Sequence, residues 1–253
     1  MTAIVSIFTI IAALATVTYT IITFRTLKEI KAQRETTYRP DVIVDESFFY
    51  IYSSETGEMS FPTEYTYEKK EAGYKPKQHY SNSFGLKFYN IGLAAAKNIQ
   101  INFSIDINKI VDLVINSSKD VDEDKRINVK HSNNSVEFKP EKKDISYASF
   151  HVINNQLERS LNHLLPVNVE ANPFIIALPT YILELNALMI YNIWNTKNKN
   201  KGFNTIPTMT LAIQYCDIGN KIHKKTVEVS IEYFGGSREE SRGIIRTVEK
   251  NYA

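Results

Sequence analysis

The chain has 253 residues, and its 30 basic and 28 acidic side chains leave a formal net charge of +2. This near balance argues against a general nucleic-acid-binding protein, which carries a marked basic excess. The single cysteine, Cys216, excludes an internal disulfide, a bond that extracellular modules often use.

An uncharged, apolar segment from Ala3 to Phe24 opens the chain. A hydrocarbon core of roughly 30 Å needs about 20 apolar helical residues to cross it, so we expect residues 1–24 to form a transmembrane anchor in a lipid bilayer. Residues 25–39 should continue as a basic juxtamembrane helix and end before Pro40, because a residue that precedes proline disfavours the α region. The basic residues that flank the anchor are Arg25, Lys28, Lys31 and Arg34.

Two other interpretations of this segment stay open. The small residues Ala13-Leu14-Ala15 match the cleavage site of a secretory signal peptide, but no basic residue precedes them and the apolar chain continues to Phe24. A buried core helix is the second alternative. Against it, threonines are spread around the helix and leave it little amphipathicity, which suits lipid better than a protein surface.

The basic flank also predicts an orientation. Cytoplasmic loops carry an excess of Lys and Arg, so we expect a single-pass protein of the cell inner membrane, with its N-terminus outside and its C-terminal domain in the cytoplasm. Hydroxyl side chains along one stripe of the helix either pair copies into a homo-oligomer or bond back to their own helix carbonyls. These residues are Thr9, Thr16, Thr20 and Thr23.

Several runs within residues 40–236 show the period of two that is typical of half-buried strands, and we expect this range to form a mainly β domain, an antiparallel β-sandwich. The expected strands are Val42–Val44, Phe48–Tyr52, Leu86–Phe88, Asn98–Asp106, Met209–Tyr215 and Val227–Tyr233. The last two should form a hairpin with a turn at 217–220, in which Cys216 opposes Lys221 and His223 opposes Gln214. Residues 53–83 lack a period and are expected to form a long loop.

Two helices should interrupt the strands. Ile107, Ile110, Val111 and Val114 have helical spacing, and residues 180–195 repeat it directly after Pro179. Residues 117–134 are charged and are expected to form a loop. Residues 237–253 are expected to form a polar C-terminal tail.

The expected loop at 53–83 holds tyrosines interleaved with lysines, namely Tyr65, Tyr67, Tyr74 and Tyr80. Aromatic residues are enriched at protein interfaces, so these side chains are candidate contacts to a protein partner. A solvated loop is the simpler alternative. Glutamates dilute the basic charge, so we expect no nucleic acid there.

We expect no catalytic, cofactor-binding or metal-binding residues. The acidic run Asp120–Asp124 lacks the glycine and closing glutamate of a calcium loop. The histidines have no close Cys or His neighbour of the kind that zinc sites use, and the proposed hairpin register separates Cys216 from His223. None of the familiar nucleophile, zinc or phosphate-binding motifs occurs.

Several short motifs together resemble a loose group of bacterial proteins that place one N-terminal transmembrane helix before an immunoglobulin-like β-sandwich. The motifs are Tyr38–Val42, Leu86–Gly92 with Ala96 and Asn98, Leu164–Pro166 and Tyr215–Gly219. The resemblance implies that fold and a membrane location, and it brings no catalytic residues. Cys216, the 53–83 loop and the 180–195 helix depart from the pattern.

Within these motifs, we interpret Asn90 and Gly92 as structural residues. An asparagine can close an Asx turn on its local backbone, and Gly92 would permit a positive φ at the strand end. The expected function is a membrane-tethered, non-enzymatic binding or scaffolding protein with a cytoplasmic recognition domain. Two alternatives stay open: a membrane effector, as in bacterial phage defence, that oligomerises through its helix and perturbs the bilayer, and a hydrolase with an unrecognised site.

Overall fold

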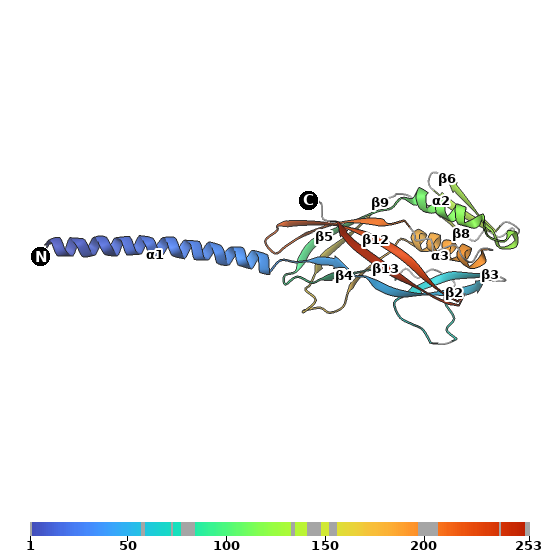
Figure 1. The fold of residues 1–253 in the computed structure, drawn as a ribbon, viewed down its shortest axis with the longest axis horizontal. Helices are drawn as coiled ribbons and strands as arrows, with labels where there is room; N and C mark the ends of the chain where they lie inside the picture. The colour runs from blue at the N-terminus through green and yellow to red at the C-terminus, as the bar shows by residue number, and fades with distance from the viewer. Residues whose placement is uncertain are drawn as a thin grey trace.

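The computed structural model consists of a long N-terminal helix that projects from a β-rich domain (Figure 1). The described residues are 2–56, 59–71, 73–76, 84–132, 135–140, 148–151, 156–196, 207–237 and 239–250.

The N-terminal helix, α1, runs without a break from Thr2 to Thr37. Its segment Ile10–Arg34 is long and apolar enough to cross a membrane, and none of it is buried against the rest of the chain. The expected anchor and the expected basic juxtamembrane segment are therefore parts of one continuous helix. It ends just before Pro40, as the sequence predicted.

A curled, antiparallel, seven-stranded sheet frames the β-domain, with strand order β3-β2-β13-β12-β11-β5-β9 (Figure 1). Its strands are β2 (Ser47–Thr56), β3 (Met59–Thr66), β5 (Ala96–Ser104), β9 (Gln156–Leu164), β11 (Met209–Cys216), β12 (Ile222–Gly236) and β13 (Glu240–Lys250).

Two small sheets and two further helices complete the domain. One sheet has the order β1-β4-β10 and the other β6-β7-β8. The bounds are β1 (Val42–Val44), β4 (Gly85–Asn90), β10 (Phe174–Ala177), β6 (Ile127–Ser132), β7 (Ser135–Pro140), β8 (Ala148–His151), α2 (Ile107–Ser118) and α3 (Thr180–Asn195), with a 3-10 turn at Glu123–Lys125.

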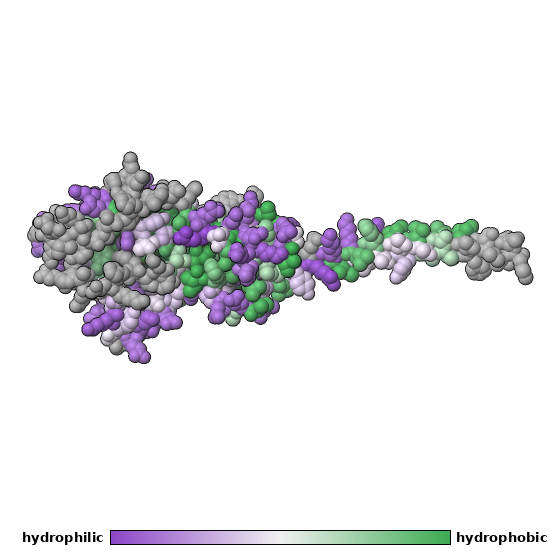
Figure 2. Space-filling model, turned by 180° about the vertical axis from the view of Figure 1, so that it is seen from behind, coloured by the Kyte–Doolittle hydropathy of each residue, from purple (hydrophilic) through white to green (hydrophobic). Residues whose placement is uncertain are grey.

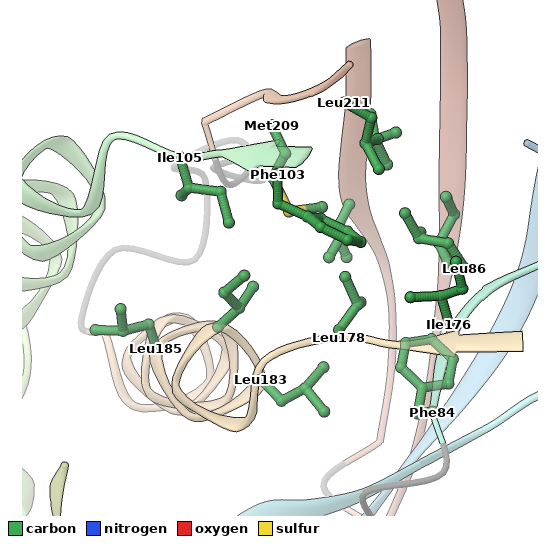
Figure 3. Packing of buried hydrophobic residues seen from close by; sticks show 14 of the residues in the cluster. Phe84, Leu86, Phe103, Ile105, Ile176, Leu178, Leu183, Leu185, Met209 and Leu211 are labelled. Atoms are coloured by element: carbon green, nitrogen blue, oxygen red, sulfur yellow. The ribbon is translucent and has the colours of Figure 1, made fainter. Parts of the chain in front are cut away.

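The core lies between the inner face of the large sheet, the β1-β4-β10 sheet and the two helices. Figure 3 shows Phe103 and Leu211 of the large sheet facing Leu86 of the small sheet and Leu183 of α3. The prediction of a mainly β, antiparallel domain with inserted helices is confirmed. The frame, however, is one large curled sheet rather than two sheets of similar size.

The strongest sequence patterns are confirmed closely. Ile99, Ile101, Phe103 and Ile105 are all buried, and α3 has the predicted bounds. Helix α2 begins where the Asp106 carboxylate accepts a hydrogen bond from the Lys109 amide at 3.0 Å, a common N-cap arrangement.

The expected loop at 53–83 is wrong over its first part, where β2 extends to Thr56 and β3 spans Met59–Thr66. Polar residues obscured the pattern, because Ser53, Thr63 and Glu64 are themselves buried. Similarly, β6 at Ile127–Ser132 occupies part of the expected charged loop at 117–134.

The expected polar tail at 237–253 is also wrong, because Glu240–Lys250 forms β13 in the interior of the large sheet, between β2 and β12. Its sequence looks polar because Ser241 and Gly243 occupy positions that face the core. A side chain at Gly243 would collide with the Phe49 ring, whose Cζ lies 2.3 Å from the ideal Cβ position.

The predicted hairpin of β11 and β12 is present, but its register differs by one residue. Cys216 pairs with Ile222 and Tyr215 with His223, so Gln214 opposes Lys224. The connecting loop covers residues 217–221 rather than 217–220, because the Asp217 amide donates to the Lys221 carbonyl at 3.0 Å and extends the turn by one residue.

Candidate functional site

The end of the β-domain that adjoins α1 brings together segments that are far apart in sequence. We call it the helix-proximal end and define it as the joint Tyr38–Asp41 with the loops 91–95, 165–173 and 217–221. The pairs Ala96↔Leu164 and Lys97↔Cys216 place the start of β5 beside the ends of β9 and β11. A bridge between Asn90 and Pro166 adds the end of β4.

Asn90 holds these segments together, and its side chain is almost fully buried. The Asn90 Oδ1 atom accepts hydrogen bonds from the amides of Asp41 at 3.0 Å and Gly92 at 3.1 Å. The Asn90 Nδ2 group donates to the carbonyls of Ala94 at 2.7 Å and Leu164 at 3.0 Å. One amide therefore fixes the joint, the 91–95 loop and the end of β9, which agrees with the structural interpretation of this motif.

Gly92 is required for a different reason from the one predicted. Its φ is not positive. Instead, an added Cβ would lie 2.2 Å from the Arg39 carbonyl oxygen and 2.5 Å from the Asp41 nitrogen. The residue permits the joint to pass directly against the loop, a close backbone approach that only glycine allows.

An ion pair and a tyrosine complete the attachment of α1. The Lys225 ammonium on β12 donates to the Asp41 carboxylate and lies 3.3 Å from Glu249. Partial burial lowers the pKa of Lys225, but the hydrogen bond and charge of Asp41 outweigh this and raise it overall. The Tyr215 hydroxyl donates to the Pro40 carbonyl at 3.5 Å.

The 217–221 turn is closed by its own polar contacts. Asp217 lies 3.1 Å from His223 Nε2 and accepts a hydrogen bond from the Lys221 amide at 2.9 Å. Burial opposes ionisation of Asp217, but the hydrogen bonds from His223 and Lys221 outweigh it and lower the pKa. His223 thus pairs with an aspartate, and it neighbours Tyr215 rather than Cys216 across the hairpin.

The candidate tyrosines have different environments. Tyr65 is buried, and its hydroxyl lies 3.0 Å from Asn186 Oδ1 and 3.2 Å from the Leu183 carbonyl of α3. Tyr67 is partly buried and donates to the Gly85 carbonyl. Tyr74 is exposed, and Tyr80 lies outside the described residues. Among these described tyrosines, Tyr74 is therefore more accessible to a partner than Tyr65 or Tyr67.

Tyr74 belongs to a small aromatic cluster on the outer side of β2. Its ring meets Tyr52 edge-on at 5.5 Å between centroids, and Tyr52 stacks on Tyr50 at 6.5 Å. The Arg242 guanidinium lies 5.5 Å from the Tyr50 ring, and the Lys70 ammonium 5.8 Å from Tyr74. This cluster joins the end of the expected loop to β13, a neighbour that the sequence did not predict.

No group of three or more His, Cys, Asp or Glu side chains suited to a metal ion occurs among the described residues. Within the run 120–124, Glu123 begins the short 3-10 turn. Another titratable group that the sequence did not single out is Glu184 on α3, where burial raises the pKa to about 7. A single glutamate among apolar helix positions gives no distinctive signal in sequence.

The flanking residues Arg25, Lys28, Lys31 and Arg34 are exposed on α1. The hydroxyls of Thr16, Thr20 and Thr23 donate to the carbonyls four residues before them, at 2.8 Å each. This arrangement corresponds to the second of the two alternatives for the threonines.

Searches of protein-family models, curated proteins and solved structures find no match to this chain. The functional inference therefore depends on the geometry above.

Proposed function

We propose that the protein tethers a binding or scaffolding domain to a membrane. The observation that carries this proposal is the exposure of α1: none of its apolar segment Ile10–Arg34 is buried against the rest of the described chain. Asn90 and Lys225 fix the following joint to the β-domain. A helix that is apolar all round and has no protein to cover it is suited to lipid. A rigid joint would hold the domain in a defined position at the membrane.

We further propose that α1 is retained as a single-pass inner-membrane anchor, with its N-terminus outside and the β-domain in the cytoplasm. The basic flank from Arg25 to Arg34 supports this orientation. The long uninterrupted helix supports retention, because the apolar core of a signal peptide spans only about 7–15 residues.

We propose that the β-domain is a non-enzymatic recognition domain. We propose that a protein partner contacts the aromatic cluster at the exposed Tyr74 and the partly exposed Tyr50, beside Arg242. Tyrosine and arginine are the residue types that dominate binding energy at many interfaces.

Membrane fractionation of the full chain would test the anchor. We expect it to resist extraction by alkaline carbonate and to keep its residues before Ala15 in intact-mass measurement. Leu14→Arg should release it, whereas the matched change Glu29→Gln on the same helix should not. A mature chain that begins after Ala15 would show a signal peptide and contradict the anchor.

Reporter fusions at the C-terminus would test the orientation. We expect cytoplasmic reporter fluorescence without alkaline phosphatase activity, and the reverse result would invert the topology.

Crosslinking in membranes would test the binding function. It should yield a defined protein that is lost in Tyr74→Ala and retained in the control Tyr89→Ala. Growth arrest with dye uptake on overproduction, abolished by Ala13→Asp, would instead indicate a membrane effector.

A further inference from the structure

The three loops of the helix-proximal end carry large apolar side chains that point into solvent. Exposed positions are Ile91 and Leu93 in the first loop, Val167 and Val169 in the second, and Ile218 with neighbouring Ile222 at the third. Val169 and Ile218 are 68% and 62% exposed. Figure 2 shows hydrophobic residues among hydrophilic ones at the end of the domain that adjoins the helix.

Backbone hydrogen bonds fix these loops, so the exposed side chains are held in place. The Ile91 amide donates to the Asp41 carbonyl at 2.9 Å, and the Val169 amide donates to the Pro166 carbonyl at 2.8 Å. The turn that carries Ile218 is closed by the Asn220 amide, which donates to the Asp217 carbonyl at 3.0 Å. Turn positions usually hold polar or glycine residues, so apolar residues at three neighbouring turns form a patch that calls for an explanation.

The charges around the patch favour an anionic surface. Arg39, Lys221 and Lys224 are exposed there. Two nearby carboxylates are paired, Asp41 with Lys225 and Asp217 with His223. Glu170 is the exposed acidic residue among these loops. Apolar tips within a basic rim are the combination that binds the interface of membranes with anionic lipids.

The position of α1 indicates that a lipid bilayer faces this apolar patch. The loops surround the joint from which the helix leaves the domain (Figure 1). The candidate span extends to Arg34, and its uncharged part ends at Phe24, about 21 Å of helix before Tyr38. Membrane helices tilt by up to about 40°. The clamped joint would make the domain tilt with the helix, so that a strong tilt brings one side of this end down to the headgroups.

We propose that the helix-proximal end of the β-domain is a second membrane-binding site, at which the tips of loops 91–95, 165–173 and 217–221 insert into the lipid interface. The proposal rests on the proposed function, because a bilayer at this end requires α1 as the anchor. The domain then lies on the membrane surface and presents its opposite end and its aromatic cluster to the cytoplasm.

Environment-sensitive fluorophores on the full chain in nanodiscs with anionic lipid would test this. In a Cys216→Ser background, single cysteines replace Ile218, Val169 or, as a matched control, Phe234. Phe234 is also an exposed apolar residue, but it lies near the far end of β12. We expect labels at 218 and 169 to show blue-shifted emission and quenching by lipid-borne nitroxides, and the label at 234 to show neither.

Each other outcome overturns the proposal in a distinguishable way. The labels at 218 and 169 could stay as solvent-exposed as the label at 234 in chains that still resist carbonate extraction. That result would support the anchor and contradict the second membrane contact. Chains that fail to incorporate into nanodiscs would contradict the anchor itself. A blue shift that occurs only with two copies per nanodisc would assign the patch to contacts between copies.

Discussion

The two ends of the β-domain are stabilised in different ways. At the helix-proximal end, the Asn90 side chain connects the joint, a loop and the end of β9 through four directional hydrogen bonds. At the far end, α2 and α3 pack apolar faces against the sheet, with Asn192 bridging the two helices at 2.8 Å to Ser117. Directional bonds fix where a chain enters, whereas apolar burial supplies most of the stability.

Replacement of a core aromatic residue should have the largest effect. Phe103 on β5 is completely buried between the sheet, the small sheet and α3. We expect Phe103→Ala to lower the free energy of unfolding by about 3–5 kcal/mol, the usual cost of such a cavity. Urea denaturation of the full chain in detergent, followed by fluorescence of the single Trp194, would measure it.

The exposed residue Val248 provides the control, because its truncation to alanine should change stability by less than about 0.5 kcal/mol. A similarly small change for Phe103→Ala would place that ring outside the core and contradict the register of β5 with β11.

Asn90→Ala should have the next largest effect, and a more local one. It leaves two amides and two carbonyls of the joint region without their partner, at a total cost of about 2–4 kcal/mol. Hydrogen exchange should accelerate first at residues 91–96 and 164–167. The matched change Asn102→Ala, on the exposed face of β5, should leave exchange unaltered. Uniform acceleration across the domain would show that the two ends do not differ in this way.

These two residues also show what the sequence could predict. Phe103 belongs to an alternating run whose period alone identifies a strand and its buried face. The same holds for α3, whose apolar spacing and preceding proline set its bounds. For Asn90, the local backbone contacts were predictable, but the bonds to Asp41 and Leu164 depend on long-range packing that no spacing encodes.

The missed elements have a common physical cause. β3 and β13 bury polar or small residues, such as Thr63 and Ser241, so neither shows a clean apolar alternation. Gly243 looked like a tail residue and instead makes room for Phe49. The joint that attaches α1 combines Asp41 and Lys225, which are widely separated in sequence, so the helix-proximal end could not be assembled from local patterns.

Glu184 offers a test at the far end. Burial on α3 raises its pKa from 4.5 to about 7, and its Oε2 atom has no hydrogen-bond partner among the described residues. Because the folded-state pKa exceeds the unfolded value, proton binding favours folding. This contribution is fully present below about pH 4.5 and is lost as the pH rises through about 7.

We therefore expect Glu184→Gln to stabilise the fold at pH 8 by about 1–2 kcal/mol, after allowance for partial solvent exposure. The advantage should shrink toward pH 5. Urea denaturation at the two pH values would measure it, with the exposed Glu158→Gln as control. An advantage that is equal at both pH values would mean that ionisation is not the cause.

The smallest expected effect distinguishes the two roles of the helix-proximal end. Ile218 lies at the tip of a turn whose hydrogen bonds use Asp217, Asn220 and Lys221, so its side chain contributes nothing to closing that turn. Because it is also mostly exposed, Ile218→Ser should change the free energy of unfolding in detergent by less than about 0.5 kcal/mol. Asp217→Asn is the informative partner, since it weakens the contacts to His223 and Lys221 and should cost more. A loss above about 1 kcal/mol for Ile218→Ser would show that the side chain packs on the domain, whereas a neutral result leaves its exposure to be explained by a contact outside the chain.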